Sequence, residues 1–110
     1  MDRKTKIEPT RSEPSSLIRG VLVLRLYVAG NSRLTRDAIV NINKLCEQYL
    51  DTGKYDLEVI NISENPELAK EANIFAVPTL IKKFPLPLRR FIGDLSRTEH
   101  ILIGMEVKRD

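Results

Sequence analysis

The stretch Val21-Leu-Val-Leu-Arg-Leu-Tyr-Val-Ala29 decides the fold class. It is almost continuously apolar and favours the β conformation, which is typical of a central strand covered on both faces. Gly30-Asn31-Ser32 then breaks the strand. Between residues 34 and 50 apolar side chains recur at helical spacing, which predicts an amphipathic helix of about four turns. A buried strand followed by such a helix indicates an α/β domain.

The rest of the chain continues this alternation. Residues 55–60 alternate apolar and acidic side chains, as a strand does, and Asn65-Pro66-Glu67 is a typical helix start with Asn as the cap. Residues 77–81 and 88–92 predict a hairpin with a proline-rich bend. Ser96-Arg-Thr-Glu99 has the pattern of a capping box that opens a last helix.

The predicted order, βαβαββα, is that of the thioredoxin-like fold, with a mixed sheet and helices on both faces. Pro78 stands where that fold places a cis-proline before its third strand. One segment keeps two interpretations open. Ile101 and Ile103 are β-branched and Gly104 disfavours a helix, so residues 101–104 also suit a strand.

Length and composition limit the class of protein. The 110 residues fit one domain, which we place at residues 19–110 after a flexible polar arm at residues 1–18. No apolar run approaches the ~20 residues that span a bilayer, and residues 1–16 lack the apolar segment of a secretion signal. We therefore expect a cytoplasmic protein without a membrane partner. One Cys and one His are too few for a disulfide or a structural zinc site within the chain.

The net charge of +3 hides an uneven distribution. The segment 82–92 contains no acidic residue and carries four basic ones, Lys82, Lys83, Arg89 and Arg90. Such a patch suits phosphates or an acidic protein surface, and it equally suits basic residues that protect a sheet edge. Few aromatic residues accompany the patch, so we do not expect nucleic-acid binding.

The sequence offers no catalytic constellation. A thioredoxin-type enzyme needs a thiolate after the first strand, and residues 29–34 contain no Cys. Cys46 lies on the apolar side of the first helix and is predicted to be a packed structural thiol, with a redox role as the alternative. His100 has no nucleophile in its own segment, and no phosphate-binding loop or other cofactor motif is present.

Several strings together resemble the KaiB family of circadian-clock proteins, over about residues 19–107. They are Leu26-Tyr-Val-Ala-Gly-Asn31, Asn65-Pro66, Val77-Pro-Thr-Leu80, Pro87-Leu-Arg-Arg90, Ile92-Gly-Asp-Leu-Ser96 and Ile101-Leu-Ile-Gly104.

The resemblance implies a non-enzymatic regulator that docks on the first ATPase ring of KaiC, a hexameric RecA-like ATPase and autokinase, and modulates its phosphorylation or ATPase cycle. It also implies two folds for one chain. The resting homodimer or homotetramer has a C-terminal half that is folded differently, and it converts slowly to a thioredoxin-like monomer that binds KaiC. Residues 101–104 fall in the part that would refold.

The resemblance also implies two sets of site residues. Those expected to bind the partner are Lys82, Arg89 and Arg90, and those expected to act in the fold switch or a turn are Pro78, Gly93, Asp94 and Gly104. Cyanobacterial clock members usually carry basic residues where this chain has Asp37 and Asn73. These departures indicate a divergent member, for which a stress-response role, or a KaiB-like sensing module with another partner, is the alternative to timekeeping.

Overall fold

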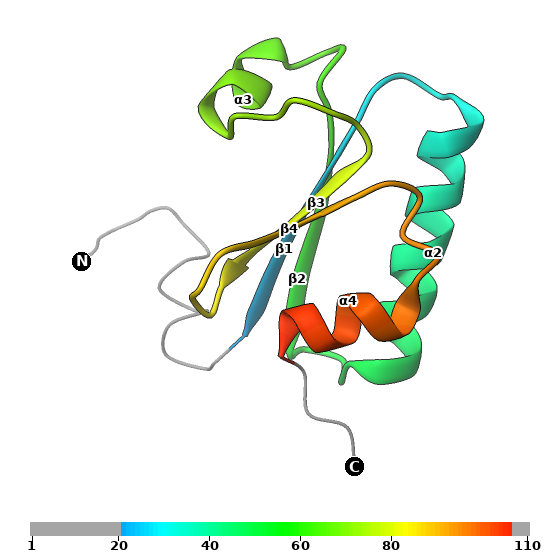
Figure 1. The fold of residues 1–110 in the computed structure, drawn as a ribbon, viewed down its shortest axis with the longest axis vertical. Coiled ribbons are helices and arrows are strands. Elements are labelled where there is room, and N and C mark those ends of the chain that lie inside the picture. The colour runs from blue at the N-terminus through cyan, green and yellow to red at the C-terminus, as the bar shows by residue number, and fades with distance from the viewer. Residues whose placement is uncertain (1–20, 107–110) are drawn as a thin grey trace.

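The computed structural model describes residues 21–106 and has the predicted order of elements (Figure 1). The elements are β1 (Leu22–Val28), α2 (Arg33–Tyr49), β2 (Tyr55–Asn61), α3 (Pro66–Glu71), β3 (Thr79–Phe84), β4 (Arg89–Ile92) and α4 (Thr98–Met105). The predicted arm, residues 1–18, lies outside the described residues, as do both ends of the predicted domain, 19–20 and 107–110. None of the helices within residues 21–106 has the length and apolar character needed to cross a membrane.

The four strands form one mixed sheet in the order β2-β1-β3-β4. β1 runs parallel to β2 and antiparallel to β3, and β3 pairs with β4 as the predicted hairpin. All seven residues of β1 are buried, as the apolar stretch 21–29 predicts for a central strand. β4 is an outermost strand, which matters for the surface described below.

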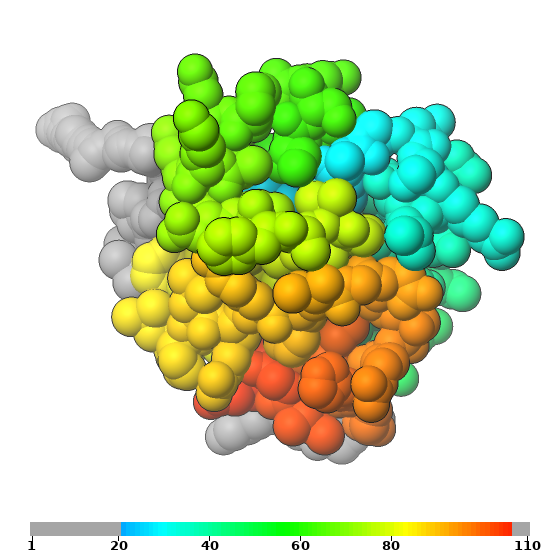
Figure 2. Space-filling view, turned by 45° about the horizontal axis from the view of Figure 1, so that its top comes forward, coloured from blue at the N-terminus to red at the C-terminus, as the bar shows by residue number. Residues whose placement is uncertain are grey.

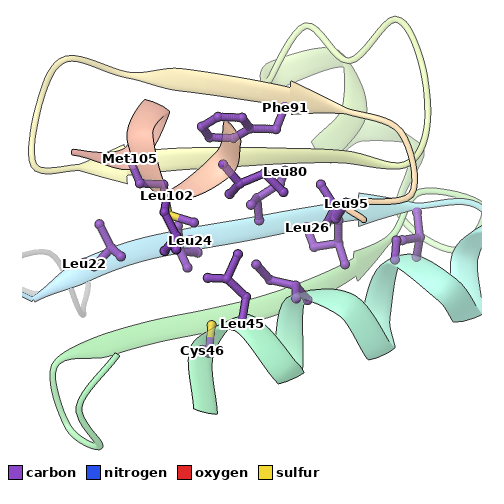
Figure 3. Packing of buried hydrophobic residues seen from close by; sticks show 14 residues of the cluster. Leu22, Leu24, Leu26, Leu45, Cys46, Leu80, Phe91, Leu95, Leu102 and Met105 are labelled. Atoms are coloured by element: carbon purple, nitrogen blue, oxygen red, sulfur yellow. The ribbon is translucent and has the colours of Figure 1, made fainter. Parts of the chain in front are cut away.

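Helices cover both faces of the sheet. α2 and α4 lie on one face and α3 lies on the other (Figure 1). The larger core fills the space between the sheet and the helix pair (Figure 3). It contains Leu22, Leu24, Leu26 and Val28 of β1, together with Ala38, Ile42, Leu45, Cys46, Leu80, Phe91, Leu95, Ile101, Leu102 and Met105. A smaller cluster of Tyr27, Ile60 and Ile81 lies on the face that carries α3.

The helix starts agree only in part with the sequence patterns. Ser32 caps α2, because its hydroxyl oxygen accepts the Thr35 N–H at 3.2 Å. Asn65 occupies the N-cap of α3 as predicted, but its side chain makes no capping bond and donates to the Asn61 carbonyl at 3.2 Å.

The predicted capping box at Ser96 is wrong. The backbone N–H of Ser96 donates to the Asp94 carboxylate at 3.0 Å, so Ser96 belongs to the preceding turn. α4 instead begins at Thr98, with Arg97 as an N-cap that makes no side-chain hydrogen bond. Residues 101–104 are helical, because Ile101, Leu102 and Met105 reach the core together only at helical spacing.

Candidate partner-binding surface

The exposed part of the predicted basic patch lies on β4, at the edge of the sheet. Neighbouring residues of a strand point to opposite faces, so Arg89 and Arg90 diverge. The Arg89 guanidinium reaches toward α4, where its Nη2 lies 3.6 Å from the Glu106 carboxylate. Arg90 reaches toward α3 on the other face, so the two cations bracket the edge strand.

Arg90 holds the end of α3. Its guanidinium donates to the Ala72 carbonyl at 2.7 Å and the Asn73 carbonyl at 3.2 Å. These acceptors lie at the C-terminal end of the helix, where a cation is also favoured by the helix dipole. Asn73 has a φ of 55°, in the left-handed region that Asn tolerates better than most residues. The chain thus has a backbone reason for Asn at position 73.

Lys82 does not belong to this surface. Its side chain is 1% exposed, and it pairs with Leu24 on the sheet face that α2 and α4 cover. The expectation that Lys82 is presented to a partner is therefore corrected for this fold. Strand alternation could have predicted this burial, because Lys82 lies two residues after the apolar Leu80 and therefore points to the same face of the sheet. Lys83 points to the opposite face and is half-buried.

The turn after β4 brings Pro78, Gly93 and Asp94 together. Val77–Pro78 is cis, at the position expected for the fold, and the Pro78 carbonyl accepts the Gly93 N–H at 3.0 Å. Gly93 has a φ of 120°, which L side chains rarely adopt. The next loop is joined to α2, because the Asn41 amide donates to the Asp94 carbonyl at 2.7 Å. Sequence reasoning missed Asn41, since nothing local marks a contact across 53 positions.

The Asp94 carboxylate stabilises the turn. Hydrogen bonds from the Ser96 side chain and then from the Ser96 backbone lower the pKa of the Asp94 carboxyl below its ordinary value. A hollow of about 280 Å³ lies beside this turn, between the end of β4 and the first turn of α4. On the surface, α3 and the loop after it adjoin β4 and this turn on one face of the molecule (Figure 2).

Gly104 lies where α4 approaches β4. A Cβ at this position would be 2.5 Å from Cε1 of Phe91 and 2.8 Å from its Cζ, so the absence of a side chain permits the close packing. The Phe91 ring also meets His100 edge-on, with ring centroids 6.3 Å apart. The structure thus gives Gly104 a packing role in addition to its expected effect on helix propensity.

The chemistry available at Cys46 is limited by its position. The thiol is fully buried on α2, among the residues of the larger core (Figure 3). Burial raises the pKa of the Cys46 thiol to about 11, which keeps it protonated near neutral pH. Within residues 21–106, no group of His, Cys, Asp or Glu is arranged to hold a metal ion.

The chain is similar to known clock proteins over most of its length. The KaiB domain model matches residues 25–107. Circadian clock protein KaiB3 of Synechocystis sp. is 45% identical over 86 residues, which cover 78% of this chain and 83% of the relative. Circadian clock oscillator protein KaiB of Thermosynechococcus vestitus is 46% identical over 90 residues, or 82% of each chain.

Solved structures agree on the fold. The N-terminal domain of Synechococcus elongatus SasA superposes with a TM-score of 0.65 at 18% identity, covering 82% of this chain and 88% of that one. Mitochondrial thioredoxin 3 of Saccharomyces cerevisiae gives a TM-score of 0.63 at 20% identity, covering 86% and 87%. The predicted thioredoxin-like fold is confirmed.

Proposed function

The chain belongs to the KaiB family, and on that premise we propose that it is a non-enzymatic regulator of a KaiC-type RecA-like ATPase and autokinase. By binding that partner it modulates the partner's phosphorylation or ATPase cycle, in a circadian-clock or stress-response role. The observation that carries the proposal is the thioredoxin-like fold of residues 21–106. The family resemblance assigns this fold to the form that binds the ATPase.

The surface we propose for the partner is the β4 edge together with the turn that follows it. Arg89 and Arg90 supply positive charge there, and Ile92 is 69% exposed beside them. Arginine is among the residues enriched at interface hot spots. Gly93 and Asp94 would present the turn, while Lys82, which is buried in this fold, would not contact the partner.

The resting form in this proposal is a cytoplasmic homodimer or homotetramer whose C-terminal half is folded differently. A partner that binds only the thioredoxin-like form draws the population toward it, and its apparent affinity falls with the fraction of that form. The short helix α4 begins without a side-chain cap and contains Gly104, so its intrinsic helical stability is low. This supports the proposal that the C-terminal half refolds.

The redox alternative is disfavoured by Cys46, whose buried, protonated thiol is a poor nucleophile. Reaction with a disulfide reagent such as dithionitrobenzoate tests this. We expect the native protein to react only as fast as it opens, and denatured protein to react at once. Rapid reaction of the native thiol would reinstate the alternative.

The proposal itself is tested by size-exclusion chromatography with light scattering, on the full chain alone and after hours with its cognate KaiC-type ATPase and ATP. We expect an oligomer that slowly yields chains bound to the ATPase hexamer. Arg89→Glu should weaken the complex, whereas Lys54→Glu, the same charge change near the opposite edge of the sheet, should not. An unchanged oligomer with no complex would contradict the proposed function and leave the family fold intact.

A further inference from the structure

A second concave surface lies on the sheet face that carries α3. It is a hollow of about 590 Å³, lined by residues of all four strands and of α3. The register places Glu58, Arg25, Ile81 and Arg90 in one row across the strands, beneath this hollow. Its size lies within the range of small-molecule sites, roughly 300–1,000 Å³.

Tyr27 brings a phenol hydroxyl to the hollow. The side chain lines the hollow and is 5% exposed. Within the described part of the chain, no group forms a hydrogen bond with its hydroxyl. Burial raises the pKa of the Tyr27 phenol, so the hydroxyl keeps its proton and can donate. A buried hydroxyl without a partner is uncommon, and it is explained if a ligand supplies the acceptor.

The cations around the hollow differ in whether a carboxylate neutralises them. Arg25 is committed to Glu58 at 3.0 Å, to Asp56 at 3.6 Å and to the Leu24 carbonyl at 2.8 Å. Lys83, on the same face, is half-buried and forms no ion pair with any residue between 21 and 106. Arg90 donates to two neutral carbonyls and so retains its net charge.

These groups divide the hollow into two sides. The β3–β4 side carries Lys83 and Arg90, neither of which forms an ion pair with another residue of 21–106. On the other side, Glu58 of β2 is neutralised by Arg25. The exposed Glu71 is the last residue of α3 and directly precedes Ala72, whose carbonyl accepts from Arg90. The apolar lining includes Ile60 and Ile81 of the sheet, Leu68 of α3 and Leu88, which directly precedes β4.

We propose that this hollow binds a small organic anion with an apolar body. The anionic group lies between Lys83 and Arg90 and accepts the hydrogen bond that the Tyr27 hydroxyl leaves unused. The apolar body covers Ile60 and Ile81. The site shares Arg90 with the partner surface on the β4 edge but lies on the sheet face that carries α3, and neither proposal depends on the other.

The test uses two fluorescent probes with similar apolar bodies. Anilinonaphthalene sulfonate carries an anionic group, and N-phenyl-1-naphthylamine is its uncharged counterpart. We expect saturable binding of the sulfonate to the full chain, and binding of the neutral probe weaker by about tenfold, the contribution of one charge-assisted hydrogen bond. Equal affinities, or no saturable binding of the sulfonate, would overturn the proposal.

A matched pair of variants locates the site. Lys83→Glu should weaken sulfonate binding by at least about tenfold, because it reverses the charge that faces the anion. Lys44→Glu makes the same change on an exposed position of α2, on the other side of the sheet, and should leave binding unaltered. Equal effects of the two variants would mean a general charge effect and would contradict the site.

Tyr27→Phe separates a ligand role from a structural one. The variant keeps the ring and removes only the hydroxyl, so probe affinity should fall about threefold. Thermal unfolding of the ligand-free variant should occur at the same or a higher temperature, because no hydrogen bond among residues 21–106 is lost. A lower unfolding temperature with unchanged probe affinity would show that the hydroxyl serves the fold, and the proposal would fail.

Discussion

The first and last parts of the domain are built in different ways. In the first, β1 is buried along its whole length and the 17-residue helix α2 begins at a capped residue. In the last, the 8-residue helix α4 lacks a side-chain cap, and Gly93, Leu95 and Glu106 have positive φ. Local preference and burial agree in the first part. In the last part long-range contacts impose conformations that the local sequence does not favour, so its stability depends more on packing.

The largest expected effect comes from removing a core leucine of β1. Leu26→Ala should lower the free energy of unfolding by about 2–5 kcal/mol, because Leu26 is fully buried in the central strand and the cavity cannot collapse. Leu102→Ala makes the same deletion in α4, and we expect a loss near the lower end of that range because the short helix can shift. Urea denaturation measures both values. Equal losses would contradict the difference between the two parts.

The second effect concerns the turn after β4. Gly93→Ala places a Cβ at a φ of 120° and should cost about 1–3 kcal/mol through backbone strain alone, since no atom lies within 4 Å of the new group. Gly53→Ala, at a φ of 84° in the turn before β2, is the matched control. Amide hydrogen exchange should show reduced protection in α4 for Gly93→Ala only. Reduced protection in both variants would mean that the two turns are not independent.

A smaller effect is expected at Gly104, where two terms oppose each other. Alanine should favour the helix by about 1 kcal/mol, but its Cβ requires the Phe91 ring to move. In the wild-type background we therefore expect less than that gain. Phe91→Leu removes the crowding ring atoms, so in that background Gly104→Ala should recover the full gain. A double-mutant cycle of unfolding free energies measures the coupling. Zero coupling would rule out the contact as the reason for glycine.

How far the sequence could predict the structure differs between the same two parts. The boundaries of β1 and α2 follow from periodicity, because the core selects the same residues that local propensity favours. The burial of Lys82 was not anticipated, because charge was given more weight than strand alternation. The capping box failed because the Asp94 carboxylate takes the Ser96 N–H. Asn41 contacts a residue distant in sequence, and Tyr27 lines a hollow formed by several elements, so no local pattern marks either one.

The smallest expected effect concerns the Asp94 carboxyl, in the turn that leads into α4. Hydrogen bonds from Ser96 hold the pKa of the Asp94 carboxyl below its ordinary value of 3.8. A folded pKa below the unfolded one stabilises the protein above the ordinary value, and the contribution disappears as pH falls through the folded pKa.

Asp94→Asn should therefore be slightly less stable than wild type at neutral pH, and the difference should vanish in acid. Ser96→Ala removes the hydroxyl that lowers the pKa most, so an NMR titration of the Asp94 side-chain carboxyl carbon should move upward toward 3.8. An unchanged titration would assign the shift to the backbone N–H of Ser96 alone. The Ser96 backbone N–H would then fix the entry into α4. The start of α2 differs, because there a side-chain hydroxyl, that of Ser32, accepts the capping hydrogen bond.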